Sequence, residues 1–198
     1  WTLSRGLGDV YKRQIYGGDS SEAEVSINSG KAIINACKKL QHKISEFHLS
    51  TNNIDNILAD LAKVDFVFLA LHGVFGEDGS IQSILDKNNI IYNGSMSNSS
   101  KNCFDKSFTK KTAKDSNILT ADFTIVGKKN FNNYNYNFRK SVIKPNKQGS
   151  SVGFSIIDDK NKISHALDFA LEHDTHAIIE EYIEGREITV SILENDAL

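Results

Sequence analysis

One proline, one methionine, one tryptophan and two cysteines are all that this chain of 198 residues contains of those four types. The two cysteines, Cys37 and Cys103, lie far apart, and neither a CxxC pair nor a histidine at metal-ligand spacing accompanies them. This spacing argues against a zinc site and a disulfide framework, and it suits a reducing compartment. We therefore interpret both cysteines as core residues.

Long apolar runs and blocks of one charge are also missing. No run reaches the roughly 18 apolar residues that span a bilayer, and the N-terminus lacks the charged-then-apolar layout of a signal peptide. Lysine and arginine number 23 against 25 acidic residues, for a net charge of -2, and no basic block offers a footprint for nucleic acid. We expect a cytoplasmic protein that binds neither membranes nor nucleic acid.

The first half of the chain alternates between helical and strand patterns. Apolar residues at helical spacing predict a helix over residues 25–40. Ser21, followed three residues later by Glu24, predicts a capping box at the start of that helix. The near-continuous apolar run over residues 65–71 is typical of a strand buried on both faces of a parallel sheet.

The same alternation continues towards the middle of the chain. A loop over residues 72–79 precedes a second helix that Ser80 is suited to cap, and a short apolar strand covers residues 90–94. Together these elements predict an α/β unit. Residues 95–102 are small and polar, as in a linker or a helix lead-in, and we place a domain boundary there.

The second half has the pattern of an α+β unit with an antiparallel sheet. One helix is expected over residues 163–171, and the Asn-rich stretch 128–140 is expected to be a poorly ordered loop or a weak helix. The five predicted strands are 121–126, 141–145, 153–158, 177–183 and 187–193.

A loop with anion-binding chemistry lies between two of these strands. Lys144 ends one strand, and residues 146–153 follow with two glycines and two serines. Backbone N–H groups with the hydroxyls of Ser150 and Ser151 form an anion cradle, and the lysine adds a charge suited to phosphate. The loop joins two strands, so it is not a Walker A loop. Taken alone, it also fits an ordinary surface hairpin.

An acidic stretch follows the last helix. Its carboxylates can accept from an adenine amino group or from ribose hydroxyls, and the backbone at Tyr182 and Ile183 can pair with the edge of an adenine ring. Taken alone, it also fits a solvated acidic hairpin. The carboxylates belong to Glu180, Glu181, Glu184 and Glu187.

Six motifs occur in an order that resembles the D-alanine:D-alanine ligase family of the ATP-grasp superfamily. The resemblance extends from about Ile15 to Leu193, and two of its motifs are long enough to be specific. In chain order they read "GGDSSEAEVSINSG", "ALHGVFGEDGSIQ", "YNGS", "DK" at Asp105 and Lys106, "VIKPNKQGSSVG" and "IIEEYIEGREITV".

The resemblance implies a fold and a reaction. The fold is α/β, with an N-terminal parallel-sheet domain over residues 15–95 that binds substrate. The small α+β domain of an ATP-grasp fold follows over residues 96–198 and is incomplete at its C-terminal end. The reaction is the ATP-dependent ligation of two D-alanines through an acyl phosphate, for peptidoglycan precursors, with ATP and Mg²⁺ as cofactors. A homodimer is expected for the full-length enzyme.

The resemblance also assigns site residues. The catalytic ones are Glu22, His72 and Ser150. The nucleotide-binding ones are Lys106, Lys144, Ser150, Ser151, Glu180, Tyr182, Ile183 and Glu187. No metal ligand is assigned, because the family's magnesium ligands lie further along its chains.

Two of these assignments compete with simpler interpretations. By the resemblance, Glu22 holds the ammonium of the first D-alanine and is bonded by Ser150, whereas a glutamate at this place otherwise caps its own helix. By the resemblance, His72 donates to the first substrate's carboxyl group or acyl phosphate. A lone histidine at a strand end is otherwise structural, and Glu77 and Asp78 are interpreted as structural.

Two departures from the family pattern limit these expectations. Residues 1–14 lack the apolar first strand, so we interpret them as non-native or disordered, with only Ile15 and Tyr16 left of that strand. The chain also ends shortly after the nucleotide-contacting motif. We therefore expect it to be inactive by itself, as a truncated nucleotide-binding fragment, while a ligase using D-lactate or D-serine as acceptor stays an alternative for the whole enzyme.

Overall fold

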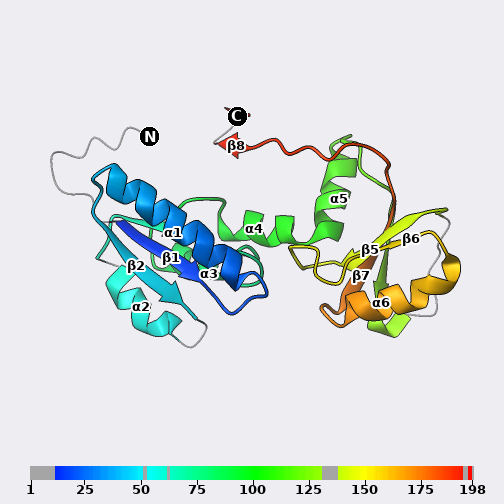
Figure 1. The fold of residues 1–198 in the computed structure, drawn as a ribbon, viewed down its shortest axis with the longest axis horizontal. Coiled ribbons are helices and arrows are strands. Elements are labelled where there is room, and N and C mark those ends of the chain that lie inside the picture. Colours follow the sequence, from blue (N-terminus) through cyan, green and yellow to red (C-terminus); the bar gives the residue numbers. More distant parts are fainter. Residues whose placement is uncertain (1–11, 51–52, 62, 131–137, 194–195, 198) are drawn as a thin grey trace.

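The computed structural model describes residues 12–50, 53–61, 63–130, 138–193 and 196–197. Two sheets lie at opposite ends of an elongated molecule, and helices α4 (Ser97–Phe104) and α5 (Lys106–Asp115) lie between them (Figure 1). The first sheet is parallel and the second is antiparallel. The predicted sequence of a parallel α/β unit and an antiparallel α+β unit is therefore confirmed.

The first sheet has the strand order β2-β1-β3, so β1 is its central strand. Its strands are β1 (Lys12–Gly17), β2 (Ile44–Leu49) and β3 (Phe66–Leu69). The prediction that only Ile15 and Tyr16 remain of the first strand is wrong, because β1 begins at Lys12 and Gln14 is fully buried. Residues 1–11 lie outside the described part of the chain.

Side chains of β1 alternate between the two faces of this sheet. Tyr16 faces α1 (Ala23–Lys39), and a Cβ added at Gly30 of that helix would lie 2.5 Å from the Tyr16 Cβ. Ile15 faces the opposite side, where α2 (Ile54–Leu61) and α3 (Ser80–Lys87) cover the sheet. The core on that side consists of Ile15, Leu49, Ile57, Leu61, Val67, Leu71, Ile81, Leu85 and Ile90.

The two predicted helix caps do not form. Glu22 occupies the N-cap position of α1, but its side chain makes no capping hydrogen bond. The Glu22 N–H donates to the Ser20 hydroxyl oxygen at 3.2 Å. The prediction of a capping box formed by Ser21 and Glu24 is therefore wrong. Ser80 is the first residue of α3, not its cap, because Gly79 holds the N-cap with a φ of 88°.

A further strand was predicted along the edge of β3, but the side chain of Asn93 bonds the backbone there. The predicted strand over residues 90–94 is reduced to one isolated parallel bridge between Tyr92 and Val67, in which the Val67 N–H donates to the Ile91 carbonyl at 2.8 Å. Asn93 accepts from the Leu69 N–H and donates to the Leu69 carbonyl at 3.2 Å. Its amide thus imitates one strand residue and ends the sheet.

Two helices connect the sheets. The polar stretch becomes α4 (Ser97–Phe104), and α5 (Lys106–Asp115) follows at once. Asp105 between them has an extended ψ of 100° and accepts from the Phe108 N–H at 3.0 Å, so it ends one helix and caps the next. Neither β2, α2 nor α5 was predicted.

The second sheet has the order β4-β7-β5-β6, and α6 (Ile163–Leu171) packs on it. Four predicted strands are confirmed, and their bounds are β4 (Phe123–Gly127), β5 (Ser141–Pro145), β6 (Ser155–Ile157) and β7 (His176–Glu181). The core includes Val126, Ile143, Ile157, Ile163, Ala166, Leu167, Ala170, Leu171, Ala177 and Ile179.

The chain after β7 departs from the prediction. Of the strand expected over residues 187–193, only β8 (Ile192–Leu193) forms, and it pairs with β9 (Asp196–Ala197). Two short 3₁₀ helices, Lys128–Asn130 and Lys160–Lys162, precede β5 and α6. The predicted loop or weak helix over residues 128–140 falls largely outside the described residues.

Both cysteines are free thiols, and neither lies in a core. Cys37 is half-buried on α1 and Cys103 is exposed on α4, so their interpretation as core residues is wrong. In the described part of the chain, no helix combines the length and the apolar character needed to cross a membrane.

Candidate functional site

The loop between β5 and β6, residues 146–154, forms a flap with an unusual backbone. Ser150 and Ser151 are consecutive residues with left-handed φ values of 44° and 59°. Each such non-glycine residue costs roughly 1–2 kcal/mol, so surrounding contacts must hold the turn. At Gly153 a Cβ would lie 2.8 Å from Pro145 Cγ, which leaves room for glycine alone.

Asn146 fastens the first residue of the flap to α5. This side chain is 5% exposed. It accepts from the Ser107 N–H at 2.9 Å and donates to Asp105 Oδ1 at 2.9 Å. Its carbonyl also accepts from the Lys106 N–H at 3.2 Å.

The carboxylate of Asp105 is the centre of this attachment. Burial raises the pKa of Asp105, but hydrogen bonds from Ser107, the Phe108 N–H and Asn146 outweigh burial and hold that pKa well below its usual range. Lys147 adds an ion pair at 3.3 Å. Asp105 therefore stays ionised and holds the start of α5 and the flap together.

The turn between α6 and β7 fastens the other side of the flap. The Lys147 N–H donates to Asp174 Oδ2 at 2.7 Å, and Gln148 Nε2 donates to the His173 carbonyl at 3.1 Å. The flap is thus held by elements on both sides of it, which fixes where its serines lie.

A cavity of about 260 Å³ lies beneath the flap, and two lysines reach it. Lys106 and Lys144 line it together with residues of the flap itself. Lys106 Nζ donates to the carbonyls of Asn146, at 3.3 Å, and Gln148. Burial and the nearby charge of Lys144 lower the pKa of Lys106. This cavity brings together the predicted phosphate-binding residues Lys106, Lys144, Ser150 and Ser151.

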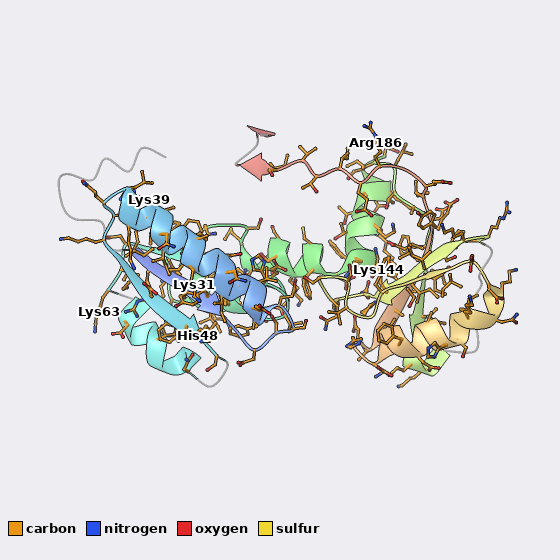
Figure 2. All side chains as sticks on the ribbon, viewed as in Figure 1. Lys31, Lys39, His48, Lys63, Lys144 and Arg186 are labelled. Carbon is orange, nitrogen blue, oxygen red and sulfur yellow. The ribbon has the colours of Figure 1, made fainter. Side chains whose placement is uncertain are left out.

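Glu180 also lies in this cluster, with lysines on both of its oxygens. Lys144 Nζ lies 2.6 Å from Oε2, and Lys110 Nζ lies 3.0 Å from Oε1. Burial raises the pKa of Glu180, but the two lysines outweigh it and hold the pKa below its ordinary value. In Figure 2, Lys144 is labelled beside α5, on the side of the second sheet that is nearer to the first sheet. Lys110 was not singled out from the sequence.

The residues predicted to contact adenine do not line the cavity under the flap, unlike those predicted to contact phosphate. The Tyr182 N–H donates to the Lys140 carbonyl at 3.1 Å, so this donor has a partner within the protein. Lys140 Nζ also lies over the Tyr182 ring, 3.7 Å from its centroid. Ile183 is 63% exposed, and Glu187 is exposed in the segment that follows β7. The roles of these residues at adenine stay predictions.

Glu22 connects the flap to the first sheet. It is 8% exposed although it is charged, and its Oε1 accepts from the Ser150 hydroxyl, as the resemblance implies. A Cβ at Gly149 would lie 2.7 Å from Glu22 Oε2. Because Glu22 makes no side-chain cap bond, the interpretation as a helix cap is wrong. Its role as the ammonium-binding residue stays a prediction.

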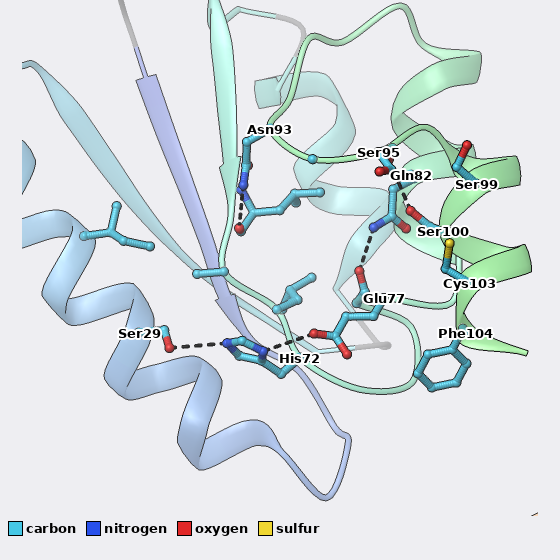
Figure 3. A pocket seen from close by; sticks show the side chains of 16 residues that line it. Ser29, His72, Glu77, Gln82, Asn93, Ser95, Ser99, Ser100, Cys103 and Phe104 are labelled. Carbon is cyan, nitrogen blue, oxygen red and sulfur yellow. Dashed lines mark hydrogen bonds and ion pairs between the residues drawn. The ribbon is translucent and has the colours of Figure 1, made fainter. Parts of the chain in front are cut away.

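His72 follows β3 at the edge of a second cavity, of about 640 Å³, between α1, α3 and α4. Its ring lies between Ser29 Oγ, 3.3 Å from Nε2, and Glu77 Oε1, 3.2 Å from Nδ1 (Figure 3). Its carbonyl accepts from the Ser20 hydroxyl at 2.8 Å. The backbone of His72 thus lies next to the Glu22 loop, while its ring faces Glu77.

Glu77 has a larger part at this site than the sequence indicated. Besides contacting His72, it accepts from the Gly73 N–H at 3.1 Å, so it fixes the ring and the loop together. Asp78 is structural as predicted, since it accepts from the N–H groups of Phe75 and Ser80 at 3.0 and 2.9 Å. In the sequence, the feature that could have indicated this role is the position of Glu77, a carboxylate five residues after a histidine at a strand end.

Residues suited to a metal ion do not gather at this site. Among the described residues, no group of three His, Cys, Asp or Glu side chains is placed to hold a metal. Glu180, the acidic side chain beside the lysine-lined cavity, is occupied by Lys144 and Lys110. The described residues therefore do not fit Mg²⁺, and no step below depends on it.

Comparisons with known proteins agree on one family. The family profile "D-ala D-ala ligase N-terminus" matches residues 48–95, and the profile "D-ala D-ala ligase C-terminus" matches residues 114–198. A D-alanine–D-alanine ligase of Clostridium botulinum is 39% identical over 189 residues, which cover 93% of this chain and 62% of that protein.

Solved structures give the same result. The crystal structure of the D-alanine–D-alanine ligase from Bacillus anthracis matches with a TM-score of 0.84 and 36% identity, over 96% of this chain and 62% of that one. A structure of the Bacillus anthracis ligase complexed with ATP matches with a TM-score of 0.73 and 32% identity, over 89% and 60% of the two chains. The chain thus spans a little under two thirds of the length of these relatives.

Proposed function

The chain belongs to the D-alanine–D-alanine ligase family, and on that premise we propose that it takes part in joining two D-alanines at the expense of ATP. The product, D-alanyl-D-alanine, serves peptidoglycan precursor synthesis in the cytoplasm. The single observation that carries this proposal is the lysine-lined cavity under a flap whose serine contacts Glu22. Two lysines beside a buried carboxylate support a phosphate-binding site next to a group suited to an amino acid's ammonium.

Each side chain has a role in the proposed reaction. In the first step the γ-phosphoryl group of ATP passes to the carboxylate of the first D-alanine, and ADP leaves. Lys106 and Lys144 stabilise the charge on the phosphates during this transfer. Glu22 holds the ammonium of that D-alanine, and Ser150 orients Glu22.

In the second step the amine of the second D-alanine attacks the acyl phosphate. A peptide bond forms, the bond between the acyl carbon and the bridging oxygen breaks, and inorganic phosphate leaves and takes up the proton that the amine loses. His72, oriented by Glu77, donates towards the acyl oxygen as negative charge builds there. The flap covers the cavity and keeps water away from the acyl phosphate.

A chimera tests this function. The chain is joined to the remaining part of the Bacillus anthracis ligase, and phosphate release and dipeptide are measured with D-alanine, D-serine or D-lactate as acceptor. We expect D-alanine-dependent phosphate release and D-alanyl-D-alanine. Lys144→Ala removes a charged partner of the phosphates worth about 2 kcal/mol, so the KM for ATP rises roughly thirtyfold while the KM for D-alanine stays nearly constant.

Three results would contradict this expectation. A chimera that folds but releases no phosphate, beside an active Bacillus anthracis enzyme, would remove the ligase function. A clear preference for D-serine or D-lactate would support the alternative acceptors. An unchanged KM for ATP in Lys144→Ala would remove Lys144 from the phosphate site.

A further inference from the structure

Lys110 lies behind the lysine-lined cavity and does not line it. It follows Lys106 by one helical turn on α5, so both side chains project from the same face of the helix. The side chain of Lys110 is only 11% exposed. Its ammonium contacts Glu180 Oε1 at 3.0 Å and Thr120 Oγ1 at 2.8 Å.

The carboxylate of Glu180 connects Lys110 to the cavity. Its second oxygen lies 2.6 Å from Lys144 Nζ, and Lys144 does line the cavity. The Glu180 side chain is 10% exposed, so solvent screens these contacts weakly. Lys110, Glu180 and Lys144 therefore form a row of alternating charge that runs from two largely buried side chains to the half-buried Lys144 at the cavity.

Charge balance shows what Lys110 adds to this row. A carboxylate paired with Lys144 alone would cancel the charge of that lysine, and only Lys106 would remain to attract an anion. With Lys110 on the other oxygen, two ammonium groups share one carboxylate and one positive charge is left over. The row then presents a net cation to the cavity, as a polyphosphate requires.

We propose that Lys110 is a positioning residue for the phosphates of a nucleoside triphosphate: it occupies Glu180, so that Lys144 keeps its charge available to the cavity. This role rests on the proposed function, since it needs a nucleotide in the cavity. Lys110 itself touches no phosphate and acts through Glu180 and Lys144.

A merely structural role makes a different prediction. Lys110 also lies 5.4 Å from the centroid of the Phe123 ring, and losing it could loosen the packing of α5 on β4. Such loosening would weaken every ligand of the site alike. Loss of charge instead weakens a ligand in proportion to its phosphates, so ATP suffers and uncharged adenosine does not.

NMR titrations of the chain with ATP and with adenosine test the role of Lys110. Lys110→Met and Lys110→Gln both delete the charge, and the glutamine keeps a donor in case the methionine variant does not fold. Lys110→Arg restores the charge. Lys114→Met is the matched control, because Lys114 lies one turn further on α5 and pairs with the exposed Asp122 at 2.6 Å.

We expect the two neutral variants to weaken ATP binding about tenfold and to leave adenosine binding unchanged. Lys110→Arg and Lys114→Met should bind ATP as the parent does. Equal ATP binding by the neutral variants and the parent would overturn the role of Lys110 alone, and so would an equal loss for ATP and adenosine. A parent chain that binds no ATP would overturn the proposed function together with it.

Discussion

Asp105 shows how much of the site depends on one residue. Its carboxylate caps α5, holds Asn146 and pairs with Lys147, so the flap and the helix share a single anchor. Its folded-state pKa is lowered, and the stabilisation is therefore present above the unfolded pKa of about 4 and lost as the pH falls through the folded value.

Asp105→Asn removes this charge and gives a prediction with a defined pH window. At pH 7 we expect the free energy of unfolding to fall by about 1 kcal/mol, because charge-assisted hydrogen bonds become neutral ones. The difference from the parent should shrink as the pH falls below about 4, because Asp105 of the unfolded parent takes up a proton there, while Asp105 of the folded parent does so only at lower pH. Urea unfolding at a series of pH values measures it, and a difference that is constant down to pH 2 would contradict it.

At this scale, sequence reasoning finds residues that belong to motifs and misses those that support them. Lys144 and Ser150 were singled out because their loop has anion-binding chemistry; the structure brings both to one cavity, and their roles stay predictions. Lys110 was missed because it is one of several lysines on a polar helix, and no pattern along the chain shows which one faces Glu180. That information appears only in the folded chain, where Lys110 of α5 meets Glu180 of β7.

Helix α1 is packed against the first sheet with little tolerance. It crosses β1 at Gly30, where an added Cβ would lie 2.5 Å from the Tyr16 Cβ. We expect Gly30→Ala to lower the free energy of unfolding by about 1–3 kcal/mol through overpacking. This range is the net loss that remains after alanine's better helix propensity, worth about 1 kcal/mol, is subtracted.

Asn28→Ala is the control for that prediction. Asn28 is exposed two residues earlier on α1, so alanine there improves helix propensity without touching the sheet. Thermal unfolding should rank Asn28→Ala at or above the parent and Gly30→Ala below it. A Gly30→Ala variant as stable as the parent would mean that α1 moves away from β1 at little cost.

Helices and strands were predictable where apolar residues form runs. They were less predictable where a strand forms only because another strand pairs with it. β3 and four strands of the second sheet have dense apolar patterns. β2 is an edge strand whose Ser45, Glu46 and His48 break any such pattern, so it was missed. The alternation at Ile188, Val190 and Ile192 predicted a strand, but these side chains are 81%, 58% and 64% exposed, and a strand needs a neighbour to pair with.

For the whole molecule, the contact between Ser150 and Glu22 joins parts that are 128 residues apart in the sequence. Composition and periodicity do not reveal this contact, and the family resemblance alone implied it. The domain boundary near residue 95 stays a prediction, and α4 lies directly after it.

Glu22→Ala tests whether that contact restrains the flap. We expect amide hydrogen exchange at residues 149–152 to become about fivefold faster, since a lost hydrogen bond of about 1 kcal/mol favours local opening by that factor. Glu24→Ala is the control, because Glu24 is an exposed neighbour on α1. Unchanged exchange at the flap in Glu22→Ala would mean that its anchors at Asp105 and Asp174 suffice.

The ammonium of Lys106 is bound by the flap's own carbonyls, those of Asn146 and Gln148. Under the proposed function, a phosphate oxygen that enters the cavity competes with these carbonyls for the N–H bonds of Lys106. Nucleotide entry and release of the inner side of the flap are therefore one exchange reaction. The lysine that holds the inner side of the flap is also the one assigned to the phosphates, so under the proposed function an arriving nucleotide frees the flap as it binds Lys106.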